Sequence, residues 1–279
     1  MPRHVVCLTF DFDAMTGFIA RGMTTPTPIS RGEFGLIGLV RILQLLDAHA
    51  IRATFFVPGV VIDMFADACE RIVAAGHEIG HHGYTHVPPA NLSREQEADG
   101  LAKGNASIAR ITGEPARGYR SPSWDLSAHT IDLLLEHAFV YESSMMGNDH
   151  MPYRVRHGDV IELEKPAVFG KETRLIEMPV SWTLDDYPHF EFLRTKATIL
   201  QGLMNANSVL ENWINDFLYM KKTEKWGILN YTFHPFVIGR GHRMMALEKL
   251  LKRLSNEGAR FMAMEDAARA YDKKFPFKG

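Results

Sequence analysis

The sequence is poor in cysteine and has no long apolar run. Two cysteines, Cys7 and Cys69, are too few for a disulfide framework among 279 residues, so we expect two reduced, buried thiols. No stretch of eighteen or more apolar residues is present, so no transmembrane helix is expected. The N-terminus runs into a strand-like segment without the apolar region of a signal peptide, which predicts a cytoplasmic protein.

An excess of charge of one sign is also missing. Lys and Arg total 31 against 33 Asp and Glu, a formal net charge of −2, so we expect neither nucleic acid nor a membrane as a partner. Hydrophobic residues make up 46% and charged residues 23%, which is ordinary for a globular protein. The length is ample for one large core, and we predict a single domain over residues 1–279.

The sequence does contain an alternation of strand-like and helix-like segments. Buried strands are predicted for residues 5–10, for "ATFFVPG" (53–59) and for "WGILNYTFHP" (226–235). Helical spacing predicts helices over residues 34–48 and about 196–221. The alternation indicates a parallel sheet with seven or so repeats, either a barrel or a doubly wound sheet. In both architectures the chemistry belongs at the carboxyl ends of the strands.

Two segments interrupt this alternation. Residues 14–32 are polar and rich in Gly, Thr and Pro, and they predict a long loop that covers the site or packs on a neighbouring subunit. Residues 145–190 predict an irregular, turn-rich insertion that can hold a hairpin.

Unusual polar side chains stand where the predicted strands end. The first strand closes with "TFDFDA", whose two carboxylates are costly to desolvate unless a cation holds them. Imidazoles and a guanidinium follow other strands in "HGYTH", "RSPSW" and "LNYTFHP". The residues concerned are Asp11, Asp13, His82, His86, Arg120 and His234. We expect them to gather at one edge of the sheet.

One carboxylate and two imidazoles in this set have the composition of a catalytic metal site. His82 and His86 are four residues apart and can reach one ion, and Asp13 would complete three protein ligands with open positions. Zn²⁺ fits these donors best, and Fe²⁺, Co²⁺, Ni²⁺ and Mn²⁺ are chemically compatible. The alternative is a pair of histidines with local hydrogen bonds. His81 is expected to point the opposite way and to be structural.

The remaining three residues suit proton transfer. Asp11 shares a side of the extended segment with Asp13 and is a candidate general base, unless it merely caps a turn. Arg120 can hold that carboxylate ionised, or it is an ordinary surface arginine. His234 is a candidate general acid, with a buried core histidine as the alternative.

The four motifs, in this order, resemble those of the polysaccharide deacetylase (NodB-homology) family along residues 5–270. The resemblance implies an α/β fold, a deformed (β/α) barrel of about seven parallel strands. It also implies a metal-dependent hydrolase of non-peptide C–N bonds, typically N-acetyl groups on sugars. Water activated by the metal attacks the carbonyl, with Asp11 as base and His234 as acid. Arg120 orients the base, and Asp13, His82 and His86 are the metal ligands.

Further residues are assigned less directly. The family uses an acid to tune the catalytic histidine, and Asp185 or Asp186 in "SWTLDDYP" is the nearest candidate. We place Asp185 with Trp124 and Trp182 among the predicted substrate-contacting residues, although both tryptophans are equally suited to the core.

Phe12 separates the two aspartates that are adjacent in polysaccharide-acting members. This chain therefore looks more like a cytoplasmic, homotetrameric branch that includes peptidoglycan-deacetylase-like proteins and cyclic imide hydrolases. We expect an N-deacetylase of a sugar or peptidoglycan-type substrate or a cyclic imide hydrolase, with neither preferred. The alternatives are a non-catalytic carbohydrate-binding relic of the fold and a structural protein whose histidines only pack.

Overall fold

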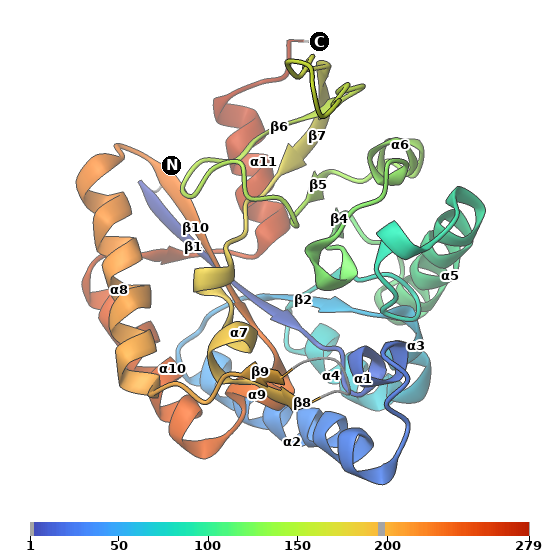
Figure 1. Cartoon of the computed structure of the whole chain (residues 1–279). Coiled ribbons are helices and arrows are strands. Elements are labelled where there is room, and N and C mark those ends of the chain that lie inside the picture. The colour runs from blue at the N-terminus through green and yellow to red at the C-terminus, as the bar shows by residue number, and fades with distance from the viewer. Residues whose placement is uncertain (1–2, 195–198, 279) are drawn as a thin grey trace.

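The computed structural model describes residues 3–194 and 199–278, which fold around a curled sheet of nine strands (Figure 1). The strand order is β10–β1–β2–β3–β4–β5–β7–β6, with β11 paired to β1, and only β6 is antiparallel to its neighbour. The strands are β1 (His4–Asp11), β2 (Thr54–Val57), β3 (Glu78–His81), β4 (Gly118–Tyr119), β5 (Tyr141–Glu142), β6 (Tyr153–His157), β7 (Lys171–Glu177), β10 (Gly227–Phe233) and β11 (Arg260–Phe261).

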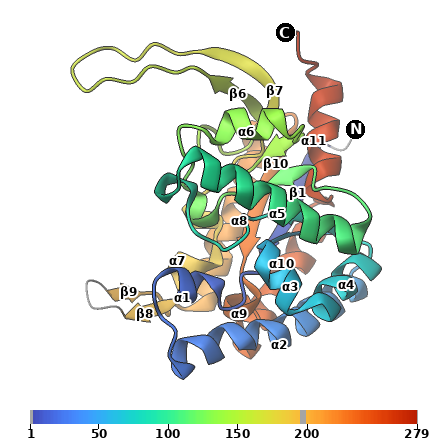
Figure 2. The same ribbon diagram turned by 90° about the vertical axis from the view of Figure 1, so that its right-hand side faces the viewer.

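Helices cover the outside of this sheet (Figures 1 and 2). They are α1 (Thr16–Ala20), α2 (Pro26–Ala48), α3 (Gly59–Met64), α4 (Ala66–Ala74), α5 (Arg94–Thr112), α6 (Thr130–Glu136), α7 (Asp186–Phe190), α8 (Ala206–Thr223), α9 (Pro235–Ile238), α10 (Gly241–Asn256) and α11 (Met264–Lys274). Short 3₁₀ turns lie at η1 (Pro89–Asn91), η2 (Pro122–Trp124) and η3 (Trp182–Leu184).

Strand β1 is the centre of the core. It is buried almost throughout and pairs with β10 from His4 to Phe10, while its last residues pair with β2. Alternate side chains enter two apolar clusters, Leu8 and Phe10 in one and Cys7 in the other. Burial on both faces explains the nearly continuous apolar run of this strand. As predicted, Cys7 and Cys69 are free and buried.

The sheet curls strongly into a half-barrel, which confirms the predicted deformed barrel. The curl brings some backbones very close to neighbouring side chains. A Cβ on Gly118 would lie 1.9 Å from Cζ of Tyr141, so only glycine fits at that position in β4.

Two predicted helix starts are wrong. Helix α2 begins at Pro26 rather than residue 34, because Pro in its first turn follows an extended Thr25 and suits a helix N-terminus. The predicted loop 14–32 therefore holds α1 and the start of α2. Helix α8 begins at Ala206 rather than 196, since the Asn205 side chain accepts the backbone N–H groups of residues 207 and 208.

The residues that precede α8 form a small hairpin instead. Strand β9 (Ile199–Gln201) pairs antiparallel with β8 (Phe192–Arg194). The expected start of the helix at residues 196–198 lies outside the described residues.

The predicted insertion 145–190 holds a hairpin, as the turn-rich sequence allowed. Strands β6 and β7 pair antiparallel with a register shift between Arg154 and Arg156. The bridge between Val160 and Val168 extends the pairing, and the tip projects away from the helices (Figure 2). The single-domain assignment for residues 1–279 stays a prediction. Within the described ranges, no helix has the length and apolar character needed to cross a membrane.

Two buried carboxyl groups face each other at the ends of β5 and β7. Glu142 and Glu177 are register partners and are both fully buried. The backbone N–H of Ser144 donates to Glu142 at 3.0 Å, and that of Met145 donates to Glu177 at 3.0 Å. Burial, and then the neighbouring Glu142, raises the pKa of Glu177 well above its ordinary value. Folding therefore favours the protonated form of Glu177.

We expect Glu177→Gln to weaken the pH dependence of the unfolding free energy. The contribution of Glu177 to stability is complete below its unfolded-state pKa and is lost as pH rises through the higher folded-state pKa. Glutamine stays neutral at every pH. The unfolding free energy of the variant should therefore rise relative to that of the parent protein as pH increases between these two pKa values. Urea unfolding at a series of pH values measures the effect, with exposed Glu211→Gln as the control. Identical pH profiles for Glu177→Gln and the parent would contradict this prediction.

Candidate active site

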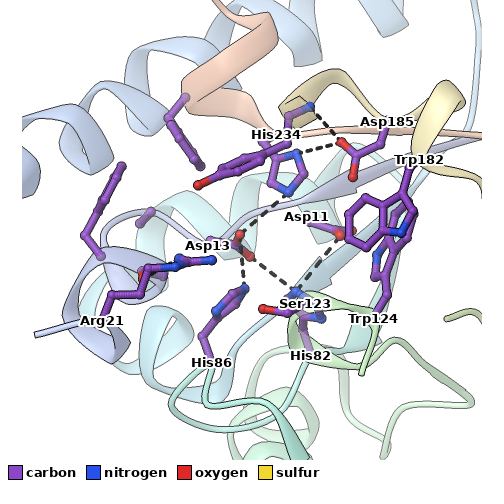
Figure 3. A pocket seen from close by; sticks show the side chains of 15 residues that line it. Asp11, Asp13, Arg21, His82, His86, Ser123, Trp124, Trp182, Asp185 and His234 are labelled. Carbon is purple, nitrogen blue, oxygen red and sulfur yellow. Dashed lines mark hydrogen bonds and ion pairs between the residues drawn. The ribbon is translucent and has the colours of Figure 1, made fainter. Parts of the chain in front are cut away.

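The two aspartates of the first motif lie at the carboxyl end of β1 and face one pocket (Figure 3). Asp11 is the last residue of the strand, and the N–H of Phe12 donates to the Phe56 carbonyl at 2.9 Å. The hydroxyl of Thr16 donates to the Asp13 carbonyl at 2.7 Å, which fixes the chain where it enters α1. Phe12 is itself fully buried in the core. The spacing by one residue thus places both carboxylates on the same side.

The two histidines of the second motif approach Asp13 from the end of β3. His82 donates from Nδ1 to the Arg120 carbonyl at 2.8 Å, and its Nε2 points to Asp13, 3.4 Å from Oδ1. Gly83 (φ 69°) and His86 (φ 61°) turn the chain back. Nε2 of His86 then lies 3.2 Å from Oδ2 of Asp13.

His81 has the structural position that the sequence predicted. Its Nε2 bonds the Leu101 carbonyl on α5 at 3.1 Å, and its ring is fully buried. Burial lowers the pKa of His81 to about 4. This histidine is therefore a packing residue.

The donor set of Asp13, His82 and His86 fits a divalent cation. Their ligand atoms lie within 4.8 Å of one another, and all three side chains are buried. Oδ1 of Asp13 is buried without a hydrogen-bond partner, a costly state for a carboxylate unless a cation is bound. Burial would raise the pKa of Asp13, but His86 and His82 outweigh it and hold that pKa well below its usual range. The site therefore presents an ionised carboxylate and two imidazoles.

Asp11 stands beside this set and belongs to a different network. Its Oδ1 accepts a 2.8 Å hydrogen bond from fully buried Arg120, while Oδ2 is 4.0 Å from Nε2 of His82. Arg120 also donates to the hydroxyl of Thr9 at 2.8 Å, and to the carbonyl and hydroxyl of Ser143 at 3.0 and 2.9 Å. The guanidinium is thus locked in place, and it orients the Asp11 carboxylate.

His234 lies across the pocket, held by an acid. Its Nδ1 is 2.8 Å from Oδ1 of Asp186, whose carboxylate also accepts the backbone N–H of His234. Nε2 faces the metal-ligand set, 3.8 Å from Oδ2 of Asp13. Burial would lower the pKa of His234, but Asp185, Asp186 and Asp13 outweigh it and raise that pKa well above its ordinary value. An imidazolium in this position can donate a proton into the pocket.

The two aspartates that the sequence left as alternatives have different contacts. Asp186 forms the direct hydrogen bond to His234, whereas Asp185 lies 3.5 Å from Nδ1 and caps α7 by accepting the N–H of Tyr187 at 2.8 Å. Asp185 also lines the pocket, and burial raises its pKa to about 8. Asp186 is therefore the acid that orients the histidine.

Trp124 and Trp182 form one wall of the pocket. Their rings stack with centroids 4.2 Å apart and an angle of 25° between the planes. Trp124 follows Ser123 in a left-handed turn, with φ of 53° and 59°, and is 9% exposed. Trp182 is 44% exposed, which argues against a core role for this side chain. The pocket beside them has a volume of about 110 Å³.

Sequence reasoning missed other residues that line the pocket. They are Ala14, Gly17, Phe18 and Arg21 from the segment around α1, and Ser123, Tyr187 and Phe236. The only feature of the sequence that pointed to Phe18 and Arg21 was the length of the predicted loop 14–32, in which both residues lie. Tyr187 directly follows Asp186, and Phe236 lies two residues after His234, but their approach to the pocket depends on the tertiary fold.

The chain is similar to several known proteins. The family model described as polysaccharide deacetylase matches residues 38–141. The chain is 35% identical to a Helicobacter pylori peptidoglycan deacetylase, over 98% of both proteins. It is 27% identical to a peptidoglycan deacetylase-like protein of Gibberella zeae, over 98% of this chain and 88% of that protein.

Two crystal structures share the fold over almost the whole chain. A Mycobacterium smegmatis protein described as a polysaccharide deacetylase gives a TM-score of 0.83 at 28% identity, covering 98% of this chain and 91% of that one. The Puue allantoinase gives a TM-score of 0.80 at 21% identity, covering 99% and 93%. The identity to the Helicobacter pylori enzyme places the chain in the polysaccharide deacetylase family of metal-dependent hydrolases that act on C–N bonds.

Proposed function

We propose that this protein hydrolyses an acyl C–N bond with a divalent metal, Zn²⁺ by donor type, held by Asp13, His82 and His86. The observation that carries the proposal is one buried pocket lined by this donor set, by Asp11 and by His234. Fe²⁺, Co²⁺, Ni²⁺ and Mn²⁺ are the alternative ions. All of these groups are present together, which argues against a relic that only binds carbohydrate.

Each group has a distinct task in the proposed reaction. The ion, when bound, supplies a Lewis acid that polarises the carbonyl and acidifies water. Asp11, oriented by Arg120, accepts the proton of the attacking water. His234, oriented by Asp186, donates a proton to the departing nitrogen. The two proton-transfer groups approach different members of the donor set, Asp11 beside His82 and His234 beside Asp13.

N-deacetylation of an amino-sugar or peptidoglycan-type substrate is the function supported best. Both curated relatives described above carry peptidoglycan deacetylase in their names. Hydrolysis of a cyclic imide is the second candidate, favoured by the small cavity and by the stacked pair Trp124 and Trp182, whose flat faces suit a planar ring. Asp185 and the two tryptophans contact the substrate in either case.

A homotetramer is part of the proposal. The β6–β7 hairpin exposes the apolar side chains of Val160, Ile161, Leu163, Val168 and Phe169, with Leu163 fully exposed and Phe169 65% exposed. Exposed apolar groups clustered on a projecting hairpin support contact with another copy of the chain. A cytoplasmic location stays a prediction.

Two variants should separate metal binding from proton transfer. Asp13→Ala is expected to abolish bound metal, because it removes the only carboxylate of the donor set. Asp11→Asn should retain the metal and lower kcat at least about a hundredfold, because it removes the base. Metal content by mass spectrometry and turnover of the same preparations measure both effects. Full activity of Asp11→Asn would refute the base assignment, and full metal content of Asp13→Ala would refute the centre.

Substrate assays should distinguish the two reactions. We expect the zinc-loaded protein to release acetate from N-acetylglucosamine oligomers and Asp11→Asn to release none. Parallel assays with succinimide and dihydrouracil report ring opening. Ring opening without acetate release would replace the deacetylase with the cyclic imide hydrolase.

Light scattering after size-exclusion chromatography should give about four times the chain mass of 31.5 kDa. The double substitution Leu163→Asp and Phe169→Asp is expected to reduce this mass, because charges on the hairpin oppose apolar contact. Met245→Asp, which alters an exposed apolar residue on α10, is the control. An unchanged mass for the double variant would exclude the hairpin as the interface.

A further inference from the structure

Arg21 is a cation at the pocket whose charge the proposed reaction does not use. It follows α1 directly, lines the pocket, and extends toward Asp13 in Figure 3. Its NH1 donates to the Gly17 carbonyl at 2.6 Å, and within residues 3–194 and 199–278 it forms no ion pair. By contrast, Arg120 forms an ion pair with Asp11, and His82 and His86 contact Asp13. Arg21 therefore leaves a positive charge at the pocket.

The position of Arg21 relative to the metal ligands is set by one short turn. A Cβ on Gly17 would lie 3.2 Å from NH1 of Arg21 and 3.6 Å from Cε1 of His86. The guanidinium and the imidazole thus flank the same space, which the glycine leaves free. Both the N–H and the hydroxyl of Thr16 donate to the Asp13 carbonyl, at 3.0 and 2.7 Å. The start of α1 is therefore tied to Asp13 itself.

A second polar group at this pocket lacks a partner. The hydroxyl of Tyr187 is buried and forms no hydrogen bond with the described residues. The Tyr187 ring packs against His234, with centroids 5.3 Å apart, and lines the same pocket as Arg21. Burial raises the pKa of Tyr187, and the charge of Arg21 opposes this rise more than any other charge does. An unpartnered phenol and a cation thus face the same space.

We infer that Arg21 and Tyr187 form a subsite for a carboxylate carried by the substrate. A guanidinium binds a carboxylate with charge-assisted hydrogen bonds, and a phenol can add one more donor. The substrate class is then a small N-acyl or imide compound with a carboxylate near the scissile C–N bond. This inference rests on the proposed function, because the subsite adjoins the metal centre.

Two hydroxamates of equal chain length, one ending in a carboxylate and one in a methyl group, test the subsite. Hydroxamates chelate the metal, so the monohydroxamate of succinic acid and uncharged butyrohydroxamate would share one anchor. Calorimetry on the zinc-loaded full-length protein measures Kd for each. We expect the charged probe to have a Kd about tenfold lower than that of butyrohydroxamate, because one charge-assisted hydrogen bond changes the affinity by about this factor. Arg21→Gln should abolish this preference, and Tyr187→Phe should reduce it.

The controls separate charge recognition from general effects. Arg71→Gln removes the same charge from an exposed arginine on α4 and should keep the preference. Unchanged binding of butyrohydroxamate in Arg21→Gln shows that the metal centre is intact. Equal affinity of the parent protein for both probes, or a preference that survives Arg21→Gln, overturns the subsite alone. If neither probe binds the zinc-loaded parent, the proposed metal centre fails and the subsite fails with it.

Discussion

The buried ion pair between Arg120 and Asp11 is the interaction on which the rest of the site depends. Arg120 is fully buried, and its donors meet Thr9 and Asp11 on β1 and Ser143 just beyond β5. Loss of one partner from such a pair leaves an uncompensated buried charge, at a cost of about 3–5 kcal/mol. The pair therefore connects strands far apart in the curled sheet while it holds one carboxylate at the pocket. Arg120 and Asp11 therefore contribute both to the packing of the sheet and to the candidate active site.

The arrangement also explains why the chain places two aspartates at the end of one strand. Asp11 is turned to Arg120, and Asp13 is turned to His82 and His86, so each carboxylate has its own set of partners. The Arg120 backbone carbonyl accepts from Nδ1 of His82, so the residue that orients Asp11 also fixes the orientation of a proposed metal ligand. Moving either carboxylate would disturb both networks.

The wall of the pocket comes from segments that are remote in the sequence. Trp124 is presented by a left-handed turn after β4, and Trp182 by the turn η3 before α7. The segment of α1 closes another side of the pocket with Gly17 and Arg21. The fold is shared with both deacetylase and allantoinase structures. Under the proposed function, these local segments, rather than the strand ends with the candidate metal ligands, select the compound that enters.

The sequence alone determined the sheet class and the groups at the strand ends, because burial on both faces requires long apolar runs and makes terminal polar residues conspicuous. It also determined Asp11, Asp13, His82, His86, Arg120 and His234 as the candidate set. Only the tertiary structure decided between Asp185 and Asp186, stacked the two tryptophans, and brought Arg21 and Tyr187 to the same pocket. Spacing along a strand is a local property with a period of two, whereas contacts between loops depend on how far the whole sheet curls. The early start of α2 and the late start of α8 have local causes. Proline in the first turn sets the start of α2, and the Asn205 cap sets the start of α8, whereas the hydrophobic periodicity used for the prediction reports neither signal.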